Sequence, residues 1–75
     1  MNKTKIQTPK LGELAYSFDF FYEQWIKAGR PQKHSVLCYF GKIDRAAKRQ
    51  LEEYGFSLTE VENTVKGTTY RMELV

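Results

Sequence analysis

Three basic residues in the second half of the chain have the types and the spacing to bind phosphate groups. Arg45, Lys48 and Arg49 stand three and four residues apart, which places their side chains on one face of a helix. Lys42 comes just before them. A row of ammonium and guanidinium groups can follow a phosphate backbone, and each contact adds affinity that falls as salt rises. This pattern predicts a surface for nucleic acid.

The alternative is that these charges only face solvent. Glu52 and Glu53 stand four residues after Lys48 and Arg49, so each of these basic side chains has an acidic neighbour on the same predicted helix. Such pairs stabilise a helix by only about 0.3 kcal/mol each. They can therefore yield to phosphate, and the sequence leaves both interpretations open.

The basic residues belong to a band of positive charge that the whole-chain charge of +3 conceals. Residues 27–49 hold seven Lys or Arg against one acidic residue, Asp44, which gives a formal charge of +6. Bands of this kind attract polyanions. Arg30 and Lys33 lie near its start in a polar connector, and we expect them to extend the basic surface if that connector lies beside the helix.

Two aromatic residues, Tyr16 and Phe20, fall on the polar side of the first predicted helix, four residues apart. Exposed aromatic pairs anchor protein partners or stack on unpaired bases. The alternative is that the N-terminal arm covers both rings. We therefore take Tyr16 and Phe20 as candidates for partner binding.

The chain lacks the residue sets that enzymes and metal sites use. Cys38 and His34 are its single cysteine and histidine, which excludes an intramolecular disulfide and a cysteine-cluster metal site. Cys38 lies in an apolar run, where cysteine behaves as a small hydrophobe. The glutamates show no acid–base pairing, and no complete phosphate-binding P-loop is present. We therefore expect no enzyme, no catalytic residue, no metal and no cofactor.

Length and composition indicate one small domain over residues 1–75. Its core must come from aromatic rings, because the chain has five Phe, five Tyr and one Trp. No apolar run approaches the roughly 20 residues that cross a bilayer. Residues 1–5 begin like a signal peptide, but no apolar segment follows them. We therefore expect a cytoplasmic protein without a membrane partner.

The first half of the chain predicts a long helix and two strands. Apolar residues recur at helical spacing after Thr8-Pro9, a typical helix start, and the pattern predicts a helix over Pro9–Ala28. Gly29 is a typical stop. A short apolar run predicts a buried strand over Ser35–Phe40, and Thr4–Gln7 predicts a short edge strand.

The second half predicts a helix and a hairpin. The helix spans Asp44–Tyr54, with Asp44 as a capping residue type and Gly55 as its stop. Alternating residues predict strands over Ser57–Glu62 and Thr68–Val75. A bulge near Thr59-Glu60 is needed to reconcile the alternation of the first strand.

Two folds have this order of elements. The first is an α+β two-layer sandwich of order β-α-β-α-β-β, with two helices on one face of a small mixed sheet. The second is a winged helix-turn-helix, in which Ser35–Phe40 is the middle helix, Asp44–Tyr54 the recognition helix and the hairpin the wing. The run Ser35–Phe40 is too compact for a full helix, which favours the sandwich.

The order of elements also resembles two known groups. One is the C-terminal domain of translation initiation factor three, which binds RNA. The other is the small sulfur-carrier family that serves tRNA thiolation, whose Cys-Pro and Tyr-Arg positions correspond to Thr8-Pro9 and Tyr70-Arg71 here. A threonine hydroxyl cannot carry persulfide sulfur, so that activity does not transfer to this chain. The resemblances imply a fold, and fold analogy alone is weak evidence of function.

Two functions remain as hypotheses. The first is a small non-enzymatic nucleic-acid-binding or regulatory protein that uses a basic helix face. Its predicted contact residues are Arg30, Lys33, Lys42, Arg45, Lys48 and Arg49. The alternative is a protein-interaction or inhibitor protein of the type found on phages and mobile elements, which binds through Tyr16, Phe20 and the hairpin edge.

Overall fold

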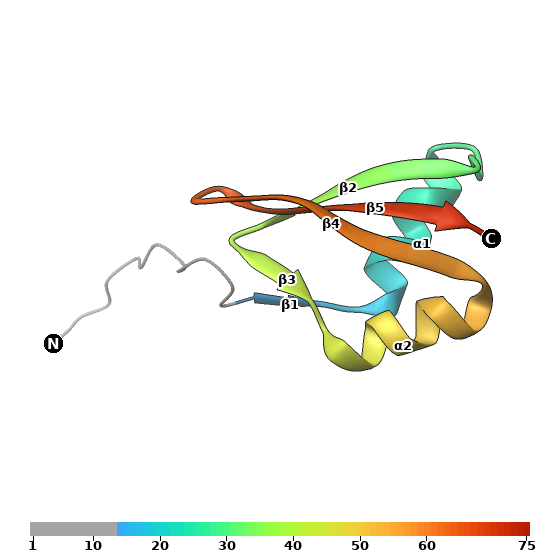
Figure 1. Cartoon of the computed structure of the whole chain (residues 1–75), viewed down its shortest axis with the longest axis horizontal. Coiled ribbons are helices and arrows are strands. Elements are labelled where there is room, and N and C mark those ends of the chain that lie inside the picture. Colours follow the sequence, from blue (N-terminus) through green and yellow to red (C-terminus); the bar gives the residue numbers. More distant parts are fainter. Residues whose placement is uncertain (1–13) are drawn as a thin grey trace, which may run out of the picture.

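Two small sheets and two helices make up the part of the chain that the computed structural model describes, residues 14–75. The elements are β1 (Leu14–Tyr16), α1 (Phe18–Lys27), β2 (Lys33–Tyr39), β3 (Gly41–Ile43), α2 (Arg45–Tyr54), β4 (Phe56–Thr64) and β5 (Gly67–Leu74). An antiparallel sheet has the strand order β2-β5-β4, and β1 pairs with β3 in parallel (Figure 1). The structure confirms the predicted α+β class and divides the expected mixed sheet into these two sheets.

The core lies between the three-stranded sheet and the two helices. Phe21 and Trp25 of α1 and Leu51 of α2 are buried in one cluster with residues of the sheet, namely Val36, Cys38, Phe56, Tyr70 and Met72. Residues that alternate along a strand share a face, so both helices cover the same face of this sheet. The structure confirms the prediction that Cys38 behaves as a buried hydrophobic residue, and Tyr70 lies in the same core.

The first predicted helix is wrong at its start. The structure places Leu14–Tyr16 in β1, and the helix begins only at Phe18. These three residues gain hydrogen bonds by pairing with β3, and Ser17 then enters the helix with extended dihedral angles. Gly41 permits the close approach, since a Cβ there would lie 2.5 Å from the carbonyl oxygen of Leu14. The predicted edge strand Thr4–Gln7 lies outside the described residues.

The winged helix-turn-helix alternative is also wrong. It requires a helix over Ser35–Phe40, but residues 33–39 form β2, which pairs along its whole length with β5. Residues in this segment are alternately buried and exposed, as a strand with one covered face requires.

The other predicted elements are confirmed. α2 follows Asp44 and ends at Gly55, whose φ of 116° is the left-handed conformation that favours glycine at a helix end. β4 and β5 form the expected hairpin, with a register shift between Glu60 and Glu62 where the sequence predicted a bulge nearby. Gly67 begins β5 at a φ of 143°, and a Cβ there would overlap the carbonyl oxygen of Cys38.

Candidate nucleic-acid interface

Helix α2 presents its basic residues to solvent because its apolar residues are turned inward. Ala47 and Leu51, four residues apart, are buried against the core. Arg45, Lys48 and Arg49 project from the opposite side and are all exposed. The backbone holds the start of this helix in place, since the Asp44 N–H donates to the Tyr16 carbonyl at 2.8 Å. The predicted row of charges therefore lies on a fixed helix.

Lys42 continues this basic surface from strand β3. Its neighbour Ile43 is half-buried, and the Ile43 N–H donates to the Tyr70 hydroxyl at 3.2 Å. Alternation along the strand turns Lys42 outward, where it is exposed. Asp44 is the only residue between β3 and α2, so Lys42 lies next to the start of the helix. We call Lys42, Arg45, Lys48 and Arg49 the basic helix face.

The predicted ion pairs within α2 are not formed. Within residues 14–75, the charged groups that come within 4.0 Å of each other are Lys33 and Glu73, at 3.9 Å. Lys48 and Arg49 therefore do not reach Glu52 and Glu53. Within residues 14–75, no acidic side chain lies within 4.0 Å of a charged group of the basic helix face.

The order of charges along α2 is unfavourable for the helix itself. Its first turn contains no acidic residue, its last turn no basic residue, and Glu52 and Glu53 lie near its C-terminus. The positive N-terminal end of a helix dipole prefers acidic side chains, and each misplaced charge costs about 0.5 kcal/mol. Arg45 and Arg49 also repel each other across four residues. These charges are not placed to stabilise α2.

The other two predicted contact residues, Arg30 and Lys33, lie elsewhere. Lys33 is paired with Glu73 at the end of the sheet where α2 ends, whereas Arg45 lies at the start of α2. Arg30 follows α1, at a φ of 55°. The Arg30 N–H donates to the Trp25 carbonyl at 3.0 Å, which holds Arg30 at the end of α1. The hydrogen bond with Tyr22 raises the pKa of Tyr54, and the charge of Arg30 acts in the opposite direction.

Tyr16 and Phe20 are brought together, but in a different way from the prediction. Tyr16 lies in β1 and Phe20 in α1, with ring centroids 4.6 Å apart. Both are half-buried and pack against the core cluster, and the Tyr16 hydroxyl donates to the Tyr39 carbonyl at 2.9 Å. These contacts explain both aromatic residues as parts of the fold.

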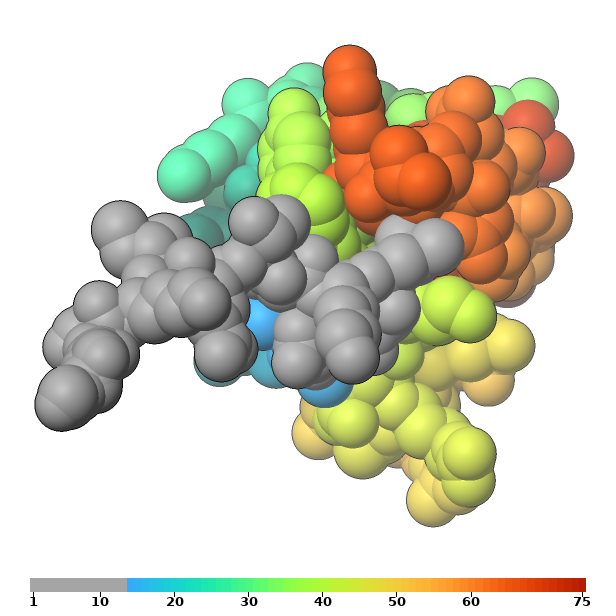
Figure 2. Space-filling model, turned by 90° about the vertical axis from the view of Figure 1, so that its left-hand side faces the viewer, coloured from blue at the N-terminus to red at the C-terminus, as the bar shows by residue number. Residues whose placement is uncertain are grey.

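Sequence reasoning missed a hollow on the outer face of the sheet, at the hairpin. Its volume is about 370 Å³, and its lining residues are Leu37, Glu62, Thr64, Val65, Lys66 and Thr69. They come from all three strands and the turn, so no local pattern in the sequence could have indicated the site. In Figure 2 the hairpin, in orange, lies on the same side of the molecule as the first turns of α2, in yellow.

The described residues show no arrangement for metal binding or for nucleophilic chemistry. Between residues 14 and 75, no three His, Cys, Asp or Glu side chains lie close enough together to hold a metal ion. Cys38 is fully buried, and burial raises the pKa of its thiol to about 12. A thiol with this pKa stays protonated and unreactive near neutral pH. None of the helices in this part of the chain is long and apolar enough to cross a membrane.

Comparison with known proteins adds no relative: no protein family, no curated protein and no solved structure matches the chain.

Proposed function

We propose that this chain is a small non-enzymatic protein that binds nucleic acid through the basic helix face. The observation that carries the proposal is the charge order of α2. Basic residues stand in its N-terminal half, against the preference of the helix dipole and without ion pairs to the acidic residues that follow. Asp44 at the N-cap is the single acidic residue at this end of the helix, and a bound phosphate backbone would add negative charge opposite the three basic residues.

The size of the basic helix face limits how much nucleic acid it contacts. Arg45 and Arg49 are separated by about 6 Å along the helix axis. This is close to the length of two nucleotides on one strand. At most, each of the four cations meets one phosphate, which limits the slope of log affinity against log salt to about −3.6 for duplex DNA and about −2.8 for a single strand. We propose that this function belongs to the cytoplasm.

The test removes the three helical charges together, in the variant Arg45→Ala/Lys48→Ala/Arg49→Ala. We expect binding to a fluorescent 20-mer, measured by anisotropy at several salt concentrations, to weaken strongly and its salt slope to fall towards −1. All three residues are exposed, and alanine is a good helix former, so the fold should persist.

A matched control removes the same charge from elsewhere in the basic band. Lys27→Ala/Arg30→Asn/Lys33→Ala also eliminates three basic residues, and Asn tolerates the left-handed backbone at Arg30. This control should bind nearly as well as the parent. Equal losses in both variants would indicate attraction by net charge alone, and an unchanged affinity in the α2 variant would exclude the basic helix face.

Protein interaction remains the second candidate function, and the exposed end of the hairpin favours it. Every residue from Thr59 to Lys66 is exposed. Tyr16 and Phe20 give this candidate less support, because both already pack within the fold. The exposed end of the hairpin is therefore the better candidate for a protein-binding surface.

A further inference from the structure

Strand β4 leaves one of its two edges free. The antiparallel sheet has the order β2-β5-β4, so β5 occupies one side of β4 and no other strand within residues 14–75 pairs with the opposite side. β4 is nine residues long and contains neither Pro nor Lys, two residue types that protect such edges, although the register shift between Glu60 and Glu62 interrupts its regular pairing. β2 is the other outer strand, but it carries Lys33, and its residues Val36 and Cys38 are buried. The open edge of β4 from Thr59 to Thr64 is therefore the best template for an added strand.

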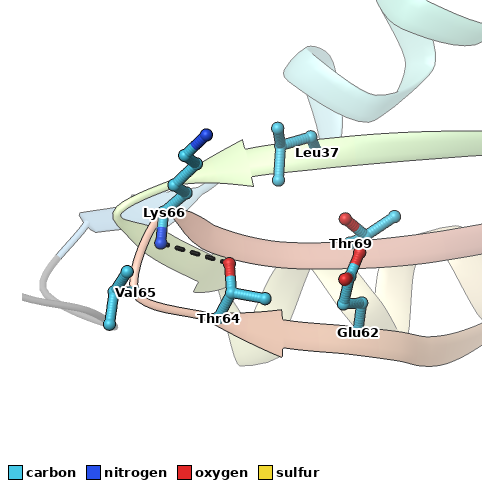
Figure 3. Close-up of a pocket in the computed structure, with 6 residues that line it drawn as sticks. All are labelled: Leu37, Glu62, Thr64, Val65, Lys66 and Thr69. Atoms are coloured by element: carbon cyan, nitrogen blue, oxygen red, sulfur yellow. Dashed lines mark hydrogen bonds between the residues drawn. The ribbon is translucent and has the colours of Figure 1, made fainter.

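The hollow lies beside this free edge, on the face of the sheet away from the helices (Figure 3). Leu37, Thr69 and Glu62 form a single row across the three strands, since Thr69 is in register with both of the others. The turn closes one end of the row with Val65 and Lys66. A side chain that enters from the β4 edge would pass over Glu62 towards Thr69.

The turn that closes the hollow is held by hydrogen bonds. The Lys66 N–H donates to the Thr64 hydroxyl at 3.1 Å, and the Lys66 carbonyl accepts from the Phe40 N–H at 2.9 Å. Gly67, which cannot carry a Cβ here, seats the turn against the backbone of Cys38. The hollow is thus formed before any ligand binds.

The charge at this edge selects the partner. The ionisable side chains of β4 are Glu60 and Glu62, and both are exposed. Glu62 faces the hollow, whereas Figure 3 shows the Lys66 side chain directed towards β2, away from Glu62. Two copies of this edge would place like charges opposite each other, which is unfavourable. A long basic side chain instead matches the carboxylate of Glu62, the threonine hydroxyls and the apolar walls of Leu37 and Val65.

We propose that the β4 edge binds an extended segment of a partner protein, which adds a strand to the sheet and places an Arg or Lys side chain over Glu62 in the hollow. Backbone hydrogen bonds to β4 supply affinity, and the hollow selects the basic side chain. The site uses acidic residues at the hairpin, so it is independent of the basic helix face and of the function proposed for it.

The probes are blocked seven-residue peptides of alternating Thr and Val with a central Arg, Ser or Glu. Backbone amide signals of the whole chain are followed by NMR as each peptide is added. The Arg peptide should shift the signals of Glu60 to Thr64, together with those of Leu37 and Thr69. The Arg peptide forms an opposite-charge pair with Glu62 across the two strands, whereas the Glu peptide forms a like-charge pair. The Arg peptide should therefore bind about tenfold more tightly than the Glu peptide.

Two single substitutions test whether Glu62, which faces the hollow, sets the preference for a basic side chain. Glu62→Lys should reverse the preference, so that the Glu peptide binds more tightly. Glu60→Lys makes the same charge change on the opposite face of β4 and should leave the preference for Arg in place. Both positions are exposed, so both variants should fold.

Three results would overturn the proposal. The first is that no signal shifts with about 2 mM peptide, which is the weak-binding limit for such a probe. The second is that all three peptides bind equally. The third is that the shifts are confined to residues away from the hairpin. Shifts at the hairpin with a single-stranded oligonucleotide but with none of the peptides would assign the hollow to nucleic acid instead. Loss of oligonucleotide binding in the α2 variant has no bearing on any of these results.

Discussion

The two helices of this protein have the same length and cover the same sheet, yet their charges are ordered in opposite ways. Each has ten residues. α1 has Asp19 in its first turn and Lys27 in its last, which is the order that the helix dipole favours. α2 begins with Arg45 and has Glu52 and Glu53 near its end. Within the helices themselves, only α1 has this order, although the N-cap residue of α2, Asp44, is also acidic.

The apolar faces of the two helices also differ, and α1 again has the more stabilising arrangement. α1 buries two large rings, Phe21 and Trp25, and the Trp25 indole N–H donates to the Pro31 carbonyl at 2.8 Å. α2 buries Ala47 and Leu51. α1 thus adds two buried rings and a favourable order of charges, whereas α2 buries a narrower apolar stripe and meets α1 through the hydroxyls of Tyr22 and Tyr54, 3.4 Å apart. The basic residues on the outer side of α2 stay exposed.

A substitution on the inner side of α1 should lower the free energy of unfolding far more than substitutions on the outer side of α2. Phe21→Ala removes a fully buried ring and should lower the free energy of unfolding by about 3–5 kcal/mol. A domain of this size has little more stability than that, so we expect the variant to be largely unfolded. The triple alanine variant of α2 should change stability by less than about 1 kcal/mol. Urea unfolding followed by circular dichroism compares the two directly.

The second prediction concerns the core that both helices share. Burial raises the pKa of the Cys38 thiol to about 12, so the folded protein keeps the proton that the unfolded chain loses near pH 9. Stability is therefore complete below about pH 9 and falls as pH rises towards 12, by at most about 1.4 kcal/mol per pH unit. Burial also raises the pKa of Tyr70, which adds a loss of the same sign above its ordinary value of 10.0.

Urea unfolding at pH 8, 9 and 10 measures this loss, with Cys38→Ala as the control. The control removes the thiol and should show a flatter profile between pH 9 and 10. An identical slope in both proteins would show that Cys38 does not remain protonated in the folded state.

Local signals in the sequence were sufficient for α2 and for the hairpin. Asp44, Gly55 and two inward residues four apart define the helix without reference to the rest of the chain. The basic helix face is equally local, because its four members lie within eight residues of sequence. The sequence alone therefore predicts these four residues as one basic surface, and the structure shows that all four are exposed.

Features that depend on distant pairing could not be predicted in this way. Leu14 and Ala15 continue the helical spacing of α1, but they pair with Gly41 and Lys42, so β1 forms instead. Arg30 was expected beside the basic residues of α2 from its position in the charged band, but in the structure its N–H donates to the Trp25 carbonyl at the end of α1. The hollow at the hairpin depends on residues from three strands and has no local signal.

Exchanging the terminal charges of each helix tests whether the order of charges affects stability, and it should have the smallest effect of these substitutions. Arg45→Glu/Glu53→Arg keeps the net charge and gives α2 the order that the dipole favours. It should raise the free energy of unfolding by about 0.5–1 kcal/mol, which corresponds to a rise in Tm of roughly 2–8 °C for a domain of this size. The same exchange in α1, Asp19→Lys/Lys27→Asp, should lower the Tm by a similar amount.

Salt separates this electrostatic effect from any change in packing, because added salt screens the dipole interactions of exposed charges. Both shifts in Tm should therefore shrink in about 1 M NaCl, where the Debye length is about 3 Å. Two shifts of the same sign would mean that the order of charges in α2 carries no cost in stability. The basic helix face would then lose the observation that most strongly separates it from an ordinary solvated surface.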